Sequence, residues 1–156
     1  MLETKSVARV ATQHMRECIR IAEGLPEYFT QSALDALQQD LGRNTIWLAH
    51  EEQQIVGFAC VLRKSSPVAE ILWLGVEKDR RRRGVGSMLL DAASRELATA
   101  GVRLLMAKTL APDVEYAPYE ATRRFYEKKG FIHLETIDPY PGWDPGNPCA
   151  IYVRVL

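Results

Sequence analysis

The chain has 156 residues, 47% of them apolar and 26% charged, a composition that predicts one globular domain over residues 1–156 with a sizeable core. Lys plus Arg number 20 and Asp plus Glu also number 20, so the formal net charge is zero, which argues against a general nucleic-acid-binding protein. There is no apolar run of about 18 residues and no signal-peptide pattern, and the three cysteines lack C-x-x-C spacing, so we expect a cytoplasmic protein with reduced thiols, no membrane partner and no metal site.

The first part of the chain predicts a strand followed by two helices. Residues 4–11 are expected to form the strand, and Thr12 is expected to cap a helix that ends at Gly24. Either Thr30 or Ser32 caps the second helix, in which leucines recur at helical spacing.

The middle of the chain predicts three strands, a helix and a fourth strand. Residues 45–50 and 54–63 are typical of two strands joined by a polar turn, and 69–76 is an apolar strand with a glycine near its end. A helix then runs from 86 to 101 and is followed by an apolar strand at 102–108. Such a strand–helix–strand unit is expected to be right-handed, with its two strands parallel.

The last part of the chain predicts a loop, a helix and two strands. Residues 109–117 form the loop, and the helix after it ends at Gly130. Residues 132–156 are expected to form two strands around the loop PYPGWDPGNP. Edge strands in this tail could pair with those of a second copy, so a homodimer is one expectation.

The most informative stretch is RRRRGVG, Arg80–Gly86, between a predicted strand and a predicted helix. A glycine turn at a helix N-terminus presents backbone N–H groups and the positive end of the helix dipole, which favours a phosphate. A Walker loop is excluded because G-x-x-x-x-G-K-[ST] is absent, and the dinucleotide pattern G-x-G-x-x-G fails because Leu89 replaces its third glycine. These departures argue against a nucleotide-binding α/β protein.

Two motifs together resemble the GNAT superfamily of acetyl-CoA-dependent N-acetyltransferases. The first is R-x-x-G-x-G, from Arg81 to Gly86, and the second is F-Y-x-x-x-G-F, from Phe125 to Phe131. The resemblance implies an α/β (α+β) fold with a mixed, mostly antiparallel twisted sheet of about six or seven strands and about four flanking helices. It also implies that the parallel strands 69–76 and 102–108 splay apart at the centre of the sheet.

The resemblance implies transfer of an acetyl group from acetyl-CoA to a primary amine of a small molecule or peptide, by direct attack in a ternary complex. Acetyl-CoA and the amine acceptor are the implied partners. The coenzyme-binding candidates, among which Tyr119 stands where many members carry Asn, are Leu74, Val76, Arg81, Arg82, Arg83, Gly84, Val85, Gly86, Ser87 and Tyr119.

Three residues are candidates for the chemistry. Period-two alternation is expected to put Glu70, Leu72 and Leu74 on one face, and apolar neighbours of this kind make a carboxyl group a better base. A water chain in place of Glu70 is the alternative for removing the amine proton. By resemblance, the backbone N–H of Leu74 polarises the thioester carbonyl and Tyr126 donates a proton to the leaving thiolate.

Aromatic residues in two loops are candidates for the acceptor side. Tyr28 and Phe29 lie between the first two helices, and Tyr140 and Trp143 lie in the tail loop. These side chains either line a substrate pocket or anchor their loops to the core. The sequence does not predict the acceptor, and a non-catalytic acyl-CoA-binding module remains the alternative function.

Overall fold

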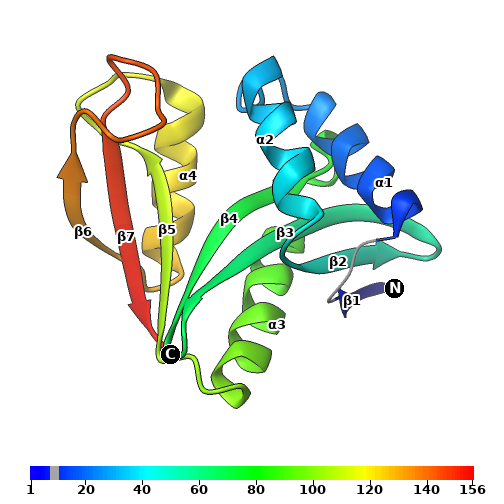
Figure 1. Cartoon of the computed structure of the whole chain (residues 1–156). Coiled ribbons are helices and arrows are strands. Elements are labelled where there is room, and N and C mark those ends of the chain that lie inside the picture. Colours follow the sequence, from blue (N-terminus) through cyan, green and yellow to red (C-terminus); the bar gives the residue numbers. More distant parts are fainter. Residues whose placement is uncertain (8–10) are drawn as a thin grey trace.

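The computed structural model describes residues 1–7 and 11–156, with Ser6 and Val7 described by their backbone. Within these residues, seven strands form one sheet and four α-helices flank it (Figure 1). The strands are β1 (Leu2–Val7), β2 (Thr45–Glu51), β3 (Gln54–Ser65), β4 (Val68–Val76), β5 (Leu104–Leu110), β6 (Ile132–Ile137) and β7 (Cys149–Val155). The helices are α1 (Thr12–Glu23), α2 (Gln31–Leu41), α3 (Val85–Thr99) and α4 (Ala117–Lys128), with a 3₁₀ turn η1 (Lys78–Arg80) before α3.

The strand order is β1-β2-β3-β4-β5-β7-β6, and every neighbouring pair is antiparallel except β4 and β5. The parallel pair is the one predicted from the strand–helix–strand unit, with α3 as its crossover. The predicted fold class is therefore confirmed.

The sheet lies between two layers of helices, and each layer has its own apolar core (Figure 1). One cluster joins α3 and α4 to one face of the sheet and includes Leu89, Leu90 and Tyr126. The other joins α1 and α2 to the opposite face and includes Ile21 and Leu37. The two faces can therefore receive different partners.

The strands β4 and β5 part at the centre of the sheet, as predicted (Figure 1). Their pairing ends at Ile71 and Ala107, although β4 continues to Val76 and β5 to Leu110. Gly75 lies in the diverging part of β4, where a Cβ atom would come within 2.7 Å of the Phe58 ring. A glycine is needed there because a side chain would collide with a fully buried ring.

A β-bulge in β4 makes one prediction about its faces wrong. Cys60 pairs with Trp73 and Val61 pairs with Ile71, so Leu72 is the extra residue. As a result, Leu72 packs against the α1/α2 cluster, whereas Leu74 packs against the α3/α4 cluster. The expected single face of Glu70, Leu72 and Leu74 does not exist, because period-two alternation fails across a bulge.

Several predicted boundaries shift. The first strand is β1, whereas the prediction ran over 4–11, of which 8–10 lie outside the described residues. Ala11 rather than Thr12 occupies the N-cap of α1, and no side chain caps that helix end. For α2, Thr30 is the cap, its hydroxyl accepting from the N–H of Ala33. The strand predicted at 102–108 begins two residues later, because Val102 still donates its N–H to the Leu97 carbonyl at the end of α3.

Candidate functional site

The turn before α3 presents a row of free backbone donors. Gly84 is the N-cap of α3 at φ +80°, and no side chain caps the helix. Arg82 also has a positive φ of 62°, which turns the backbone in the same loop. The first backbone hydrogen bond of the helix runs from Met88 N–H to Gly84 C=O. Among the described residues, no hydrogen-bond acceptor is found for the backbone N–H groups of 82–87. An uncapped helix N-terminus of this kind is suited to an anion.

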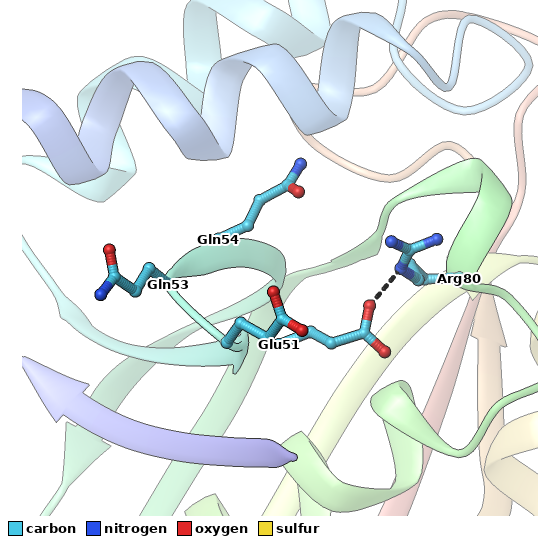
Figure 2. Close-up of a pocket in the computed structure, with 5 residues that line it drawn as sticks. Glu51, Gln53, Gln54 and Arg80 are labelled. Atoms are coloured by element: carbon cyan, nitrogen blue, oxygen red, sulfur yellow. Dashed lines mark ion pairs between the residues drawn. The ribbon is translucent and has the colours of Figure 1, made fainter.

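The four arginines beside this turn have different surroundings. Arg80 forms an ion pair with Glu51 at 2.5 Å, across the shallow depression that Figure 2 shows beside the β2–β3 turn. Arg81 pairs with Glu27, whereas the side chains of Arg82 and Arg83 are exposed. The charge available to a ligand is therefore greatest at Arg82 and Arg83.

Backbone N–H groups of β4 point into the opening between β4 and β5. Glu77 donates its N–H to the carbonyl of Val56 in β3. In an antiparallel ladder the N–H groups of alternate residues point to the same side, so those of Gly75 and Glu77 face β3. Those of Leu74 and Val76 consequently point away from β3, toward the space that β5 has left.

The loop between α1 and α2 contacts the start of α4 through tyrosine side chains. The hydroxyl of Tyr28 donates to the carbonyl of Pro118 at 2.8 Å, and that of Tyr116 donates to the carbonyl of Glu27 at 2.8 Å. The ring centres of Tyr28 and Tyr119 lie 5.4 Å apart, and the Arg81 guanidinium lies 5.3 Å from the centre of the Tyr28 ring. These contacts bring together three segments: the loop between α1 and α2, the turn before α3, and the start of α4.

Phe29 is buried and Tyr119 is half-buried, each against other aromatic rings. Phe29 is buried against Trp73, with 5.5 Å between ring centres, so it anchors its loop to the core. Burial, helped by the neighbouring hydroxyls of Tyr116 and Tyr28, raises the pKa of Tyr119.

Tyr126 is part of the core beside the opening. Its ring is 6% exposed and lies 5.4 Å from the ring of Phe125 and 5.1 Å from that of Phe131. Burial raises the pKa of Tyr126 above its ordinary value, so the phenol stays protonated throughout the neutral range.

Glu70 is buried between two lysines. Its side chain is 1% exposed, with Oε1 3.0 Å from Lys64 Nζ and Oε2 3.0 Å from Lys108 Nζ. The Oε2 contact is an ion pair without the alignment of a hydrogen bond. The apolar surroundings expected from the sequence are replaced by a charge cluster.

The tail loop joins this cluster through Tyr140. Lys108 Nζ donates to the Tyr140 hydroxyl at 3.2 Å and stands 5.0 Å from the centre of its ring. Trp143 lies 5.4 Å from Tyr140, ring centre to ring centre. Tyr140 therefore touches a charged group of the sheet, whereas Trp143 supports Tyr140.

The sequence reasoning missed Lys64, Lys108 and Tyr116. A lysine at the end of an apolar strand, as in the run Val102–Lys108, is a signal that could have pointed to Lys108. No comparable signal marks Tyr116 or Lys64. Two further titratable side chains have other partners: Glu77 pairs with Arg20 at 2.6 Å, and His133 bonds Thr136 on edge strand β6.

The three cysteines are buried and free. Burial, the largest cause, raises the pKa of Cys18 and of Cys60 to about 12, and that of Cys149 to about 11. These thiols are therefore poor nucleophiles. Within residues 1–7 and 11–156, no three His, Cys, Asp or Glu side chains gather as a metal site, and none of the helices has the length and apolar character to cross a membrane.

A splayed strand pair, backbone donors aimed into the splay and an uncapped helix N-terminus beside it form a site suited to an extended, phosphate-bearing ligand. The family model described as "Acetyltransferase (GNAT) domain" matches residues 42–133. The chain belongs to the GNAT family of acetyltransferases.

Relatives agree with this assignment. N-alpha-acetyltransferase 60 of Drosophila melanogaster is 38% identical over 80 residues, which is 49% of this chain and 26% of that protein. The chain thus matches about a quarter of the length of that curated relative. The non-catalytic alternative is not favoured.

Solved structures agree in fold. A protein assigned to the GNAT family from Desulfovibrio desulfuricans superposes with a TM-score of 0.83 at 24% identity, covering 98% of this chain and 99% of the other. The ribosomal-protein-S18-alanine N-acetyltransferase of Escherichia coli gives 0.75 at 20% identity, covering 99% and 94%. An aminoglycoside 6'-N-acetyltransferase complexed with coenzyme A gives 0.72 at 18% identity, covering 98% and 96%. At these identities the likeness shows the fold alone.

Proposed function

We propose that this protein transfers an acetyl group from acetyl-CoA to a primary amine of a small molecule or peptide, by direct attack in a ternary complex. The observation that carries the proposal is the pair of N–H groups, of Leu74 and Val76, directed into the splay beside the uncapped start of α3. Three of the relatives support an amine as acceptor by their names, which are N-alpha-acetyltransferase 60, ribosomal-protein-S18-alanine N-acetyltransferase and aminoglycoside 6'-N-acetyltransferase.

The chain fits the coenzyme at both ends. The free N–H groups of 82–87 would bind the pyrophosphate, and the exposed side chains of Arg82 and Arg83 would reach the 3′-phosphate of the adenosine. The N–H of Val76 would bond the pantetheine arm in the splay. Arg81 and Tyr119 are proposed as the residues that close this site toward the loop between α1 and α2.

Two groups would serve the reaction at the thioester. The N–H of Leu74 donates to the carbonyl oxygen, which gains negative charge as the amine attacks. The Tyr126 hydroxyl donates to the sulfur as the carbon–sulfur bond breaks. Its raised pKa makes it a weaker proton donor than a phenol in water, but also ensures that the proton is present.

The amine proton has two proposed acceptors. Glu70 would have to loosen its contact with Lys64 or Lys108 before taking a proton, because each oxygen faces one ammonium group at 3.0 Å. A water chain from the splay to solvent needs no such change. We therefore place the water chain ahead of Glu70.

The experiment that tests this function is release of free thiol from acetyl-CoA across a panel of amines, with coenzyme binding measured separately by calorimetry. Turnover on any primary amine, with the acetyl group found on nitrogen by mass spectrometry, would support the proposal. Tight acetyl-CoA binding without turnover on a panel of small amines and peptides would reject catalysis and restore the non-catalytic module.

A further inference from the structure

The charge cluster around Glu70 has more positive than negative charge. Lys64 and Lys108 contribute two ammonium groups, and Glu70 contributes one carboxylate that is 1% exposed. The Lys64 side chain is 39% exposed and the Lys108 side chain 20%, so both can meet a solute. Because a buried carboxylate needs one cation for balance, one positive charge is left over.

This excess charge lies where the sheet opens. Lys108 follows Ala107, the last residue of β5 that pairs with β4. Ala107 packs in the α3/α4 cluster, so the alternation along β5 directs Lys108 to the opposite face, the one that α1 and α2 partly cover. The coenzyme phosphates would lie at α3, and the Glu70 cluster is therefore on the acceptor's side of the splay.

A count of donors leaves Lys108 one free N–H. An ammonium group has three N–H bonds and no lone pair. One N–H points to the Tyr140 hydroxyl at 3.2 Å, whereas the contact with Glu70 at 3.0 Å is an ion pair without hydrogen-bond alignment. Among the described residues Lys108 Nζ donates no other hydrogen bond, so at least one N–H is available to a ligand.

The ammonium group is also fixed in place and charged. Tyr140 holds it from the tail loop, with its ring centre 5.0 Å away, and Glu70 holds it from β4. Burial alone would lower the pKa of Lys108, but the hydrogen bonds and charges of Glu70 and Tyr140 outweigh it, so the pKa is raised. A preorganised cation with a free donor binds a carboxylate better than a mobile surface lysine does.

We propose that Lys108, positioned by Glu70 and Tyr140, binds a carboxylate group of the amine acceptor. This inference rests on the proposed acetyl transfer and narrows its substrate class to amines that also carry a carboxylate, either free amino acids or peptides with an acidic side chain near the N-terminus. The excess charge repels acceptors with several amino groups and no acid, such as aminoglycosides and polyamines.

The test compares acceptors that differ only in this group. Tripeptides with Asp or Asn at the first, second or third position form one set, and amino acids with their amides form the other, each compared at a pH that corrects for the amine pKa. We expect kcat/KM to be about tenfold or more higher for the acid of the preferred pair, mainly through KM. Which set shows the preference distinguishes free amino acids from peptides.

Variants assign the preference to Lys108. Lys108→Met is expected to abolish it, whereas Lys128→Met, at the end of α4, retains it. Because Lys108→Met leaves Glu70 short of one partner, the double variant Lys108→Met/Glu70→Gln is made as well, since it removes both charges together. Lys108→Arg should restore part of the preference. Equal kcat/KM for acid and amide in the wild type, or a preference that survives in the double variant, would overturn the inference.

A second measurement separates this inference from the proposed function. Binding of N-acetylated amino acids and peptides, as acids and as amides, is measured by calorimetry in the presence of coenzyme A. If no amine is turned over but the acids bind more tightly and lose this advantage in Lys108→Met/Glu70→Gln, acetyl transfer fails and the carboxylate site stands. If amines are turned over without an acid preference, acetyl transfer stands and the carboxylate site fails.

Discussion

Arg81 Nη2 lies 3.0 Å from Glu27 Oε1, which joins the turn before α3 to the loop between α1 and α2. The main-chain hydrogen bond at Glu27 and the Arg81 guanidinium lower the pKa of the Glu27 carboxyl, and burial acts against both. The carboxylate is thus present at neutral pH, and Arg81, beside the proposed phosphate site, has part of its charge balanced.

We predict that Glu27→Gln strengthens acetyl-CoA binding. Removing the carboxylate frees Arg81 to contact the coenzyme phosphates. Loss of a surface ion pair of this kind is expected to change Kd by up to about fivefold. Calorimetric titration at low and high salt measures it, and the gain should shrink as salt screens the charges. Glu135→Gln on β6 is the matched control. Weaker binding in Glu27→Gln would mean that the ion pair shapes the site rather than competing for Arg81.

Tyr126→Phe should lower turnover and leave coenzyme affinity nearly unchanged. The ring keeps its packing against Phe125 and Phe131, and only the proton donor is lost, for which a fall in kcat on the order of 100-fold is expected. Tyr152→Phe is the control, because Tyr152 is a buried tyrosine of the same cluster whose hydroxyl bonds Glu127. A kcat equal to that of the wild type in Tyr126→Phe would remove this residue from the mechanism.

Gly75→Ala should destabilise the protein by about 1–3 kcal/mol. The new Cβ atom would lie 2.7 Å from the Phe58 ring, which is fully buried and cannot move without disturbing the α1/α2 cluster. Chemical denaturation measures the loss. Gly86→Ala serves as the control, since its Cβ would meet the Phe125 ring at an ordinary 3.6 Å. Equal stabilities of the two variants would show that β4 yields easily at this point.

Local sequence patterns were sufficient for the sheet, the parallel pair and the glycine turn that opens α3. Each of these depends on features a few residues apart, such as the glycines at 84 and 86 after an apolar strand. The bulge at Leu72 could not be predicted in this way, because it is fixed by the pairing of β4 with β3. The same bulge separates Leu74 from the face that alternation had assigned to it.

The acceptor side could be predicted least. Tyr28 meets Pro118 and Lys108 meets Tyr140 across long stretches of chain, and no periodicity relates such partners. The surroundings of Glu70 differ from the prediction for the same reason, since Lys64 and Lys108 approach it from the two strands that flank β4. The ionisation and reactivity of a side chain depend on such neighbours as well as on its residue type.

The most direct test of the account is calorimetric titration of the wild type and of Gly84→Asp with acetyl-CoA, coenzyme A and ATP. Gly84 has φ +80° with nothing within 4 Å of a Cβ atom, so the variant adds a negative charge and backbone strain at the free N–H groups of 82–87 without a collision. Gly84→Ala, with at least as much backbone strain and no charge, is the matched control, and the melting temperature of each variant verifies its fold. The account predicts wild-type binding of acetyl-CoA and coenzyme A in clear preference to ATP, with a loss on the order of 100-fold in Gly84→Asp that exceeds the loss in Gly84→Ala. Undiminished acetyl-CoA affinity in a folded Gly84→Asp variant would contradict it.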